Sequence, residues 1–234
     1  MRLDKYLADM GVGTRSLIKE KIKKGCVTVN AEVAKRPEQQ VKESDKITLH
    51  GREVGYAQVE YYMLNKPAGY VSATEDKRHK TVLDLIDGKK RKDLFPVGRL
   101  DIDTEGFLLI TNDGALAHQL LSPKKHVEKS YYARVKGRVD ALDIAKFIDG
   151  VDIGEEKKTL PAALTILKSD DISEVEITIM EGKYHQIKRM FEAVDKEVIY
   201  LKRLSMGKLL LDEKLALGAY RALSEEEIAQ LKGK

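Results

Sequence analysis

The chain has 234 residues and a formal net charge of +4 at pH 7, a length that suits one large domain or two smaller ones. Cys26 is its single cysteine, which excludes a disulfide framework, and no apolar run reaches membrane-spanning length. Residues 1–5 contain no apolar signal core, so we expect a cytoplasmic protein. Lysine and arginine gather in residues 1–36, 77–99 and 183–208, which favours a polyanion such as RNA as the partner.

The sequence first predicts a small unit of about fifty residues, in which two short helices precede strands. Residues 3–10 place apolar side chains at helical spacing, and Thr14 is positioned to cap a second helix that ends at Gly25. Short strands are expected at 26–29 and 46–49. The apolar stripe of the second helix consists of Leu17, Ile18 and Ile22. The lysines of that helix lie outside the stripe, so one side of the unit is basic.

This unit resembles the S4 RNA-binding domain, which holds structured RNA against its paired helices. The matching residues are 2–7, 14–16 and 25–30. Ala31 departs from the family, which usually has glycine in that turn. The basic side chains expected to contact RNA are Arg2, Lys5, Arg15 and Lys19. We therefore expect an S4-like domain over residues 1–58, tethered through a linker over 51–60.

The remainder, residues 59–234, predicts an α+β domain with a mainly antiparallel, mixed sheet, because the expected strands outnumber the helices and often adjoin each other. Strands are expected at 61–64, 107–110, 131–135, 162–167, 174–180, 198–201 and 209–211. Helices are expected at 81–86, 115–121, 140–148 and 184–194. A turn is expected at 65–69, and Ser224 with Glu227 forms a capping box for a final helix.

The most informative stretch is Gly-Arg-Leu-Asp-Ile-Asp-Thr-Glu-Gly at residues 98–106, which opens onto an apolar strand. A carboxylate at the mouth of a core strand is held rigidly and partly desolvated, and both conditions suit a catalytic group. The spacing of Asp101 and Asp103 imitates a calcium loop, but Asn112 stands where such a loop requires glutamate. A two-carboxylate glycosidase site remains open on spacing alone.

Four ordered motifs, together with the leading S4-like unit, resemble the RsuA-type pseudouridine synthases. The motifs are residues 63–69, 98–106, 128–131 and 181–191. The resemblance covers nearly the whole chain, and it implies an enzyme that detaches uracil from its ribose and rejoins it through C5 without a cofactor or a metal. Gly-Lys-Tyr-His-Gln at 182–186 is closer to the small-subunit branch, which implies 16S rRNA, and within it the family's target at position 516.

The resemblance also assigns roles to single residues. Asp101 matches the catalytic aspartate, which attacks C1′ or C6 of the nucleotide or removes the C2′ proton. Lys188 matches the basic partner that keeps this carboxylate ionised, and Tyr131 matches the tyrosine that packs against the base. Other side chains expected to contact substrate or RNA are Arg99, Arg189, His185 and Lys66. Asp103 and Thr104 are expected to organise the turn by bonding backbone amides.

Three alternative functions and one geometric control complete the predictions. The alternatives are a 23S rRNA enzyme of the same family, a noncatalytic RNA-binding ribosome assembly factor, and a metal-dependent nuclease or glycosidase. Tyr132 should face the opposite side of its strand from Tyr131, since successive strand residues alternate. The expected partner is rRNA, free or within a small-subunit assembly intermediate, and the chain is expected to act as a monomer.

Overall fold

The computed structural model of the chain describes residues 1–55, 59–87 and 91–233. The predicted linker over 51–60, and with it the predicted boundary after residue 58, fall partly outside these ranges. Lys89 and Lys90 of the basic segment 77–99 also lie outside the described residues. Within the three described ranges, none of the helices has the length and apolar character needed to cross a bilayer.

The described residues form two compact units. The N-terminal unit consists of Met1–Glu60 with Asp87–Leu94, and the C-terminal unit consists of Tyr61–Ile86 with Phe95–Lys234. The chain therefore passes between the units at three points, because a short segment of the later sequence belongs to the first unit.

Arg91 anchors this segment in the N-terminal unit. The residue is only 4% exposed, and its guanidinium pairs with Asp93 and lies 3.6 Å from Asp9 Oδ2. The backbone N–H of Arg91 also donates to Glu60 Oε2 over 3.2 Å. A buried guanidinium is costly unless it is paired, so these contacts explain why the segment folds against the first unit.

The N-terminal unit packs two helices and an antiparallel sheet around one apolar core. The helices are α1 (Leu3–Asp9) and α2 (Arg15–Lys23), and the strands in sheet order are β2 (Glu32–Val33), β1 (Val27–Val29), β3 (Ile47–Leu49) and β4 (Arg52–Glu53). The predicted cap at Thr14 is confirmed, because its hydroxyl accepts from Leu17 N over 3.3 Å. Ile18 and Ile22 are buried as predicted, but the prediction was wrong for Leu17, which is 44% exposed because it lies roughly a quarter turn around the helix from Ile18.

The β1–β2 turn explains the departure at Ala31. Asn30 and Ala31 have φ angles of 51° and 70°, the left-handed pair that a two-residue hairpin turn requires. Glycine adopts this conformation freely, whereas for a residue with a Cβ atom the left-handed conformation costs about 1 kcal/mol. Alanine therefore changes the energy of this turn rather than its shape.

An eight-stranded mixed sheet runs through the C-terminal unit, and in the part described all its strand pairs are antiparallel except β7 with β11. The strands in sheet order are β14 (Tyr220–Ala222), β5 (Tyr61–Lys66), β7 (Glu105–Thr111), β11 (Glu197–Arg203), β8 (Lys129–Lys136), β10 (Ile172–Ile179) and β9 (Ala163–Lys168). β6 (Phe95–Pro96) pairs with β7, and β12 (Ser205–Met206) forms a separate ladder with β13 (Leu209–Leu210). The predicted α+β class with a mainly antiparallel sheet is confirmed.

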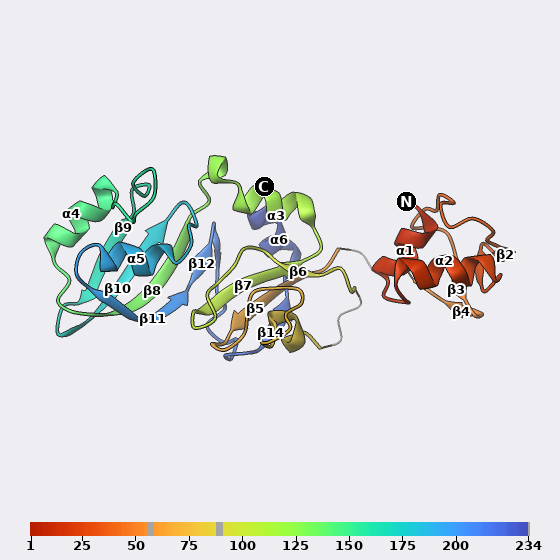
Figure 1. Cartoon of the computed structure of the whole chain (residues 1–234), viewed down its shortest axis with the longest axis horizontal. Helices are drawn as coiled ribbons and strands as arrows, with labels where there is room; N and C mark the ends of the chain where they lie inside the picture. The colour runs from red at the N-terminus through yellow and green to blue at the C-terminus, as the bar shows by residue number, and fades with distance from the viewer. Residues whose placement is uncertain (56–58, 88–90, 234) are drawn as a thin grey trace. The chain divides into compact units, whose positions relative to one another are not determined.

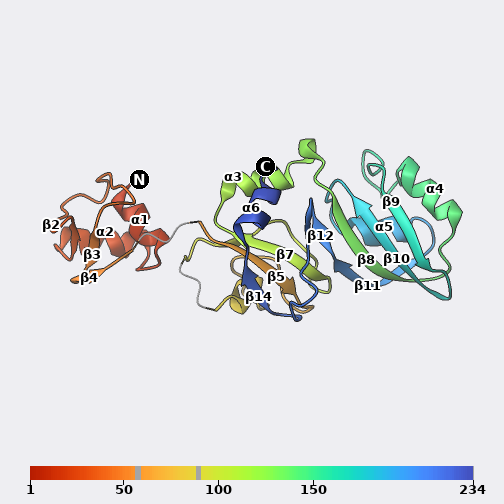
Figure 2. The ribbon, with the colours of Figure 1, turned by 180° about the vertical axis from the view of Figure 1, so that it is seen from behind.

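Helices cover the two halves of this sheet separately (Figures 1 and 2). They are η1 (Val82–Leu85), α3 (Gly114–Leu121), η2 (Pro123–Lys125), α4 (Ala141–Asp149), α5 (Gln186–Glu192) and α6 (Glu225–Leu231). Figure 1 shows α5 in front of β8 and β10, and the reverse view in Figure 2 shows those strands in front of α5. Phe147 of α4 meets Phe191 of α5 edge-on, with ring centroids 5.0 Å apart. In the other half, Leu116 of α3 and Leu231 of α6 share a core with Phe107 of β7.

The end of β5 and the start of α5 differ from the predicted boundaries, whereas the capping box of α6 agrees with the prediction. β5 continues to Lys66, so the turn expected over 65–69 begins later. α5 begins at Gln186 rather than at residue 184, because His185 has a left-handed φ of 49° that cannot continue a helix. The capping box of α6 is confirmed: Ser224 and Glu227 bond each other's backbone amides at 2.8 and 3.2 Å.

Candidate active site

Lys66 shapes the loop that carries Asp101, between β6 and β7. Its side chain is fully buried, and its ammonium donates to the carbonyls of Asp101 (3.0 Å) and Thr104 (2.8 Å). The carbonyls of Pro67 and Ile102 accept further bonds from the same ammonium. The prediction that Lys66 contacts RNA was therefore wrong, because strand β5 points the residue inward and four backbone oxygens surround its charge.

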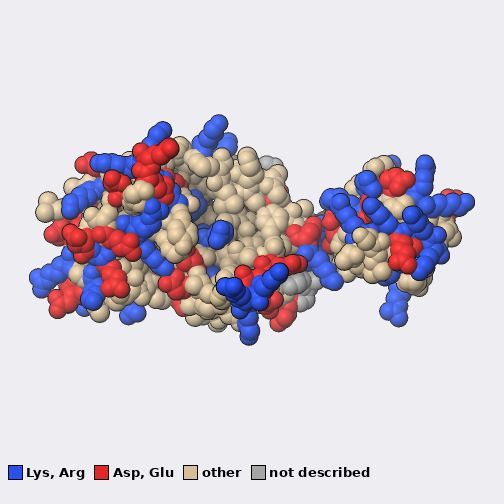
Figure 3. All heavy atoms as spheres, in the orientation of Figure 1, with Lys and Arg blue, Asp and Glu red and all other residues tan. Residues whose placement is uncertain are grey.

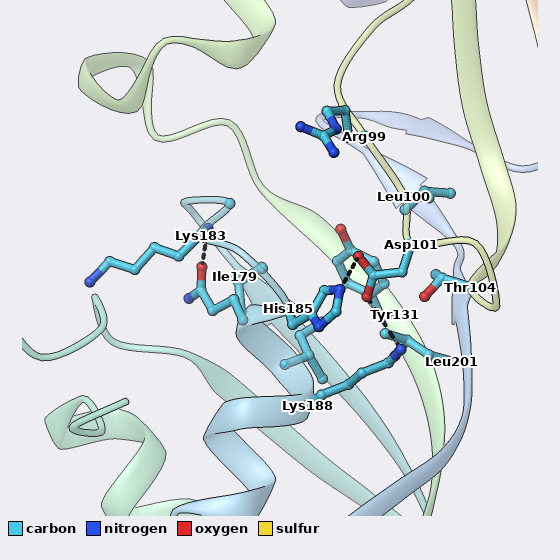
Figure 4. A pocket seen from close by; sticks show the side chains of 13 residues that line it. Arg99, Leu100, Asp101, Thr104, Tyr131, Ile179, Lys183, His185, Lys188 and Leu201 are labelled. Atoms are coloured by element: carbon cyan, nitrogen blue, oxygen red, sulfur yellow. Dashed lines mark hydrogen bonds and ion pairs between the residues drawn. The ribbon is translucent and has the colours of Figure 1, made fainter. Parts of the chain in front are cut away.

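The carboxylate of Asp101 lies between two basic side chains (Figure 4). Lys188 Nζ is 3.4 Å from Asp101 Oδ2, and His185 Nε2 is 3.5 Å from Oδ1. The Asp101 side chain is 24% exposed, so it is partly withdrawn from water and still open to a ligand. Lys188 comes from α5 and His185 from the residue before it, so one turn of chain supplies both partners.

Lys188 also holds Asp103, at shorter distances than it holds Asp101. Its Nζ donates to both carboxylate oxygens of Asp103, at 2.7 and 2.8 Å. Burial opposes the charge of Lys188, but the hydrogen bond to Asp103 and the two nearby carboxylates outweigh it and raise the pKa of Lys188 above its usual value. Lys188 is therefore a permanent cation at physiological pH. Asp103 thereby fixes the position of that cation. The prediction that Thr104 bonds a backbone amide was wrong, because its buried hydroxyl has no hydrogen-bond partner among the described residues.

Tyr131 lines the same pocket as Asp101 and Lys188. It lies on β8 and is 7% exposed. Tyr132 is partly exposed, and its hydroxyl donates to Glu174 Oε2 over 2.7 Å. The predicted alternation is thus present, and only Tyr131 presents its ring to the pocket.

The remaining candidates of this unit divide between the pocket and the scaffold. Arg99 lines the pocket and a larger adjoining groove, as does His185. Arg189 points elsewhere: Nη1 donates to Glu155 Oε1 over 2.8 Å and to the Tyr184 carbonyl over 3.0 Å, and Nη2 bonds the Ile153 carbonyl. These contacts use its guanidinium to tie α5 to the loop before β9, and its side chain is 25% exposed, so the contact of Arg189 with RNA stays a prediction.

The candidates in the N-terminal unit all lie on its surface. Arg2 bonds Asp4 through two nitrogens at 2.9 and 3.0 Å, and Lys5 pairs with Asp9 at 2.9 Å. Arg15 and Lys19 of α2 are exposed. The basic side chains of Arg2 and Lys5 are 50% and 48% exposed although their carboxylate partners are largely buried, so both remain accessible to a polyanion.

Gln186 is a functional candidate to which the sequence analysis gave no role. The side chain is 4% exposed, its amide nitrogen donates to Glu181 Oε1 over 2.9 Å, and its oxygen accepts from Lys183 N over 2.9 Å. Gln186 therefore closes the loop that presents His185 to Asp101. The signals in the sequence were its place in the motif at 181–191 and its position near the start of an amphipathic helix.

A groove of about 1030 Å³ adjoins the pocket, and its lining includes Arg99, Asp101, Tyr131 and His185. A volume of this size lies at the upper end of the usual range for ligand sites, so it has room for a nucleotide. Figure 3 shows this unit hollowed at its middle, with lysine or arginine side chains in and around the hollow. A carboxylate, two basic partners and an aromatic ring thus converge at the floor of a basic groove.

Comparisons with known proteins agree with this arrangement. Residues 60–193 match the RNA pseudouridylate synthase family, and residues 1–47 match the S4 domain. The chain is 49% identical to the uncharacterized RNA pseudouridine synthase YtzG of Bacillus subtilis, covering 97% of both chains. It is 42% identical to the ribosomal small subunit pseudouridine synthase A of Pasteurella multocida, covering 98% of both.

A solved structure described as a pseudouridylate synthase superposes with a TM-score of 0.70 at 38% identity, covering 99% of both chains. The identity is high and extends over both units, so the similarity reaches beyond the shared fold. The chain belongs to the RNA pseudouridylate synthase family and is an enzyme that isomerises uridine in RNA.

Proposed function

We propose that Asp101 is the catalytic group of this pseudouridine synthase, with Lys188 as its charge partner and Tyr131 as the ring that packs on the target base. The observation that carries the proposal is the position of the Asp101 carboxylate, 3.4 Å from the Lys188 ammonium and in the same pocket as Tyr131. The nearby ammonium orients the carboxylate, whose ionised form acts as a nucleophile or a base.

The reaction needs little more than this arrangement. The bond between C1′ and N1 breaks, the uracil turns, and a bond forms between C1′ and C5; the C5 proton leaves to solvent and N1 takes up a proton. Asp101 serves either by attacking the nucleotide covalently or by removing the C2′ proton. Tyr131 holds the detached ring by stacking, which contributes about 1–3 kcal/mol. No step of this sequence requires a cofactor.

The target uridine must leave its base stack to reach Asp101, because the carboxylate lies at the floor of the groove. Extruding a nucleotide costs a few kcal/mol. Contacts between the groove and the neighbouring RNA backbone offset this cost. Arg99 lines the groove directly before Leu100 and Asp101, so it is the proposed contact to the nucleotides beside the target.

The proposed substrate is small-subunit rRNA, and the proposed enzyme is a monomer acting in the cytoplasm. The name of the Pasteurella multocida relative supports the substrate, as do residues 182–186. The S4 match supports docking on structured RNA.

Purified enzyme, 16S and 23S transcripts, and pseudouridine mapping test the choice of substrate. We expect a single modified uridine in the 16S transcript and none in the 23S transcript. Modification of the 23S transcript alone would replace the proposed target with the large-subunit alternative. Should neither free transcript react, the same assay on small-subunit assembly intermediates decides between a ribonucleoprotein substrate and a different RNA.

Removing residues 1–58 is expected to weaken RNA binding and flatten its salt dependence. On duplex-like RNA each lost phosphate contact reduces the slope of log K against log salt by about 0.9. Uridine isomerisation should persist at raised RNA concentration, because Asp101, Lys188 and Tyr131 all lie in the C-terminal unit. Filter binding at several salt concentrations measures the slope, and circular dichroism checks the fold.

The double variant Arg15→Ala, Lys19→Ala in the full chain is the matched control, since both side chains are exposed. It should also flatten the slope of log K against log salt. Unlike the truncation, it keeps the N-terminal unit to which Arg91 and Leu94 belong, so those two residues stay covered. An unfolded truncation product would show that the C-terminal unit depends on the first unit for stability.

Activity is expected to fall above about pH 8, because burial lowers the pKa of Lys66 to about 8 against its ordinary 10.5. Loss of the Lys66 proton removes donors to the carbonyls that hold the Asp101 loop. Between these two pH values the unfolded chain binds more protons at this group, so by linkage Lys66 makes the unfolding free energy rise with pH. The titration of Lys66 therefore does not favour unfolding in this range, and circular dichroism across it checks that the fold is kept.

The pH profile of kcat/KM in Lys66→Arg tests this account. Arginine keeps its charge throughout the range, so the alkaline limb near pH 8 should move upward or vanish while the protein stays folded. A limb that stays in place in this variant would assign the titration to another group.

A further inference from the structure

The C-terminal unit buries cations that its proposed chemistry does not use. Lys129 is 8% exposed and Arg203 is 2% exposed. Both line the large groove. The fully buried Lys66 donates hydrogen bonds to four backbone carbonyls, whereas Lys129 and Arg203 have no such set of acceptors.

Register places both cations beside Tyr131 on one face of the sheet. Arg203 of β11 pairs directly with Tyr131 of β8, and directly opposed residues of an antiparallel pair share a face. Lys129 precedes Tyr131 by two residues on β8, so it also shares that face. The two side chains therefore form the groove floor next to the ring that holds the target base.

Neither cation forms a close ion pair with another described residue. Arg203 Nε donates to the Phe107 carbonyl over 2.7 Å, while its Nη2 is buried and has no hydrogen-bond partner among the described residues. The ammonium of Lys129 donates to the Val127 carbonyl over 2.8 Å. Among the described residues, the ion pairs closer than 4.0 Å include neither Lys129 nor Arg203. The charge of Glu181 acts on Lys129 from farther away. Its Oε1 accepts hydrogen bonds from the Leu160 backbone amide and from the Gln186 side chain.

Two buried, unpaired cations side by side are unfavourable in the free protein. Burial, and then the charge of Arg203, lower the pKa of Lys129. Removing one charge from water costs several kcal/mol unless an opposite charge or a full set of acceptors compensates it. An anion that entered the groove would relieve both costs at once, so this surface is preorganised for a negative ligand.

We propose that Lys129 and Arg203 bind one phosphodiester of the RNA strand, next to the nucleotide whose base packs on Tyr131. This inference rests on the proposed use of the groove for RNA. A phosphate fits better than a base edge, because both side chains only donate hydrogen bonds and a phosphate offers negative oxygens without donors. The planar guanidinium suits two phosphate oxygens, and the lysine adds a point charge.

Phosphate-ethylation interference on a 16S rRNA transcript tests the proposal without requiring turnover. Ethylation neutralises single phosphates at random, and the positions depleted from the bound fraction mark the phosphates that the protein needs. The unmodified protein should show one strong position beside the bound uridine. Lys129→Met and Arg203→Met should both lose interference at that position and keep it elsewhere, with binding about tenfold weaker.

Lys136→Met is the matched control, because Lys136 lies on the same strand but its side chain is 72% exposed and does not line the groove. It should retain the interference at every position. Lys129→Met should also melt at the same temperature as the unmodified protein or higher, because it removes an uncompensated buried charge.

The proposal is overturned if Lys129→Met keeps every interference position, or if its melting temperature falls sharply while the interference pattern is unchanged. Arg203→Met gives the same decision should Lys129→Met fail to fold. Binding is measured without catalysis, so an Asp101→Asn enzyme that still isomerised uridine at nearly the normal rate would overturn the role of Asp101 and leave this site standing.

Discussion

Asp101→Asn is expected to lower kcat by about 10⁴-fold, the upper end of what a positioned acid, base or nucleophile contributes. The amide has the shape of the carboxylate but cannot serve as a nucleophile or accept a proton. RNA affinity should stay within a few-fold of the unmodified protein, because the basic side chains that line the groove and the whole N-terminal unit are unchanged. Release of tritium from RNA labelled at C5 of uridine measures the reaction, since that hydrogen leaves when C1′ bonds C5.

Two neighbouring variants distinguish chemistry from general disturbance of the site. Lys188→Met removes the ammonium 3.4 Å from Asp101 and should cost about 10²-fold, because the carboxylate loses its orientation and its charge partner. Asp103→Asn leaves that pair in place and should cost less than about tenfold. An Asp101→Asn enzyme whose rate lies within tenfold of the unmodified enzyme would contradict the proposed role.

Gly106→Ala is expected to prevent stable folding, at a cost of about 4 kcal/mol or more. A Cβ atom on Gly106 would lie 2.2 Å from the carbonyl oxygen of Arg203 and 2.8 Å from its nitrogen, at a backbone φ of +98°. This is the parallel contact between β7 and β11, the pairing that joins the two halves of the sheet. Neither central strand can move away without losing its own ladder.

Gly114→Ala is the control for this substitution. Gly114 begins α3 and has nothing within 4 Å of its would-be Cβ atom, so alanine should leave stability unchanged or raise it by up to about 1 kcal/mol. Urea unfolding of both variants measures the difference. If Gly106→Ala were as stable as the unmodified protein, the close approach of β7 and β11 would not be what requires glycine in this motif.

The sequence predicted the elements whose signals are local. The cap at Thr14 and the box formed by Ser224 and Glu227 depend on side chains that bond amides two or three residues away. The alternation on β10 likewise marks its buried face, with Val175 and Ile177 fully buried. Such features are set within a few residues, so a single sequence is enough to find them.

The fates of the basic side chains could not be predicted from the sequence. Lys66 and Arg189 stand in motifs that look suited to RNA, yet one is enclosed by backbone carbonyls and the other is bound to Glu155. Lys129 and Arg203 stand in strands that gave no sign of a charged groove floor. Whether a lysine or arginine faces RNA or the protein depends on acceptors supplied by distant segments, which periodicity cannot reveal.

The arrangement around Asp101 was predictable only in part. The resemblance indicated that Lys188 lies near Asp101, but it did not indicate that Asp103 binds the same ammonium at a shorter distance. The approach of His185 to Asp101 depends on its left-handed backbone, which ends the helical spacing that the sequence suggested. Both features arise where the loop between β6 and β7 meets the start of α5. These segments are far apart in the sequence, and only the folded sheet brings them together.

Pseudouridine mapping of rRNA from cells that lack the gene, complemented with either the unmodified chain or Asp101→Ala, tests the central claim most directly. The account predicts that one pseudouridine of 16S rRNA disappears with the gene, returns with the unmodified chain, and stays absent with Asp101→Ala expressed at the same level. Restoration of that pseudouridine by Asp101→Ala would contradict it.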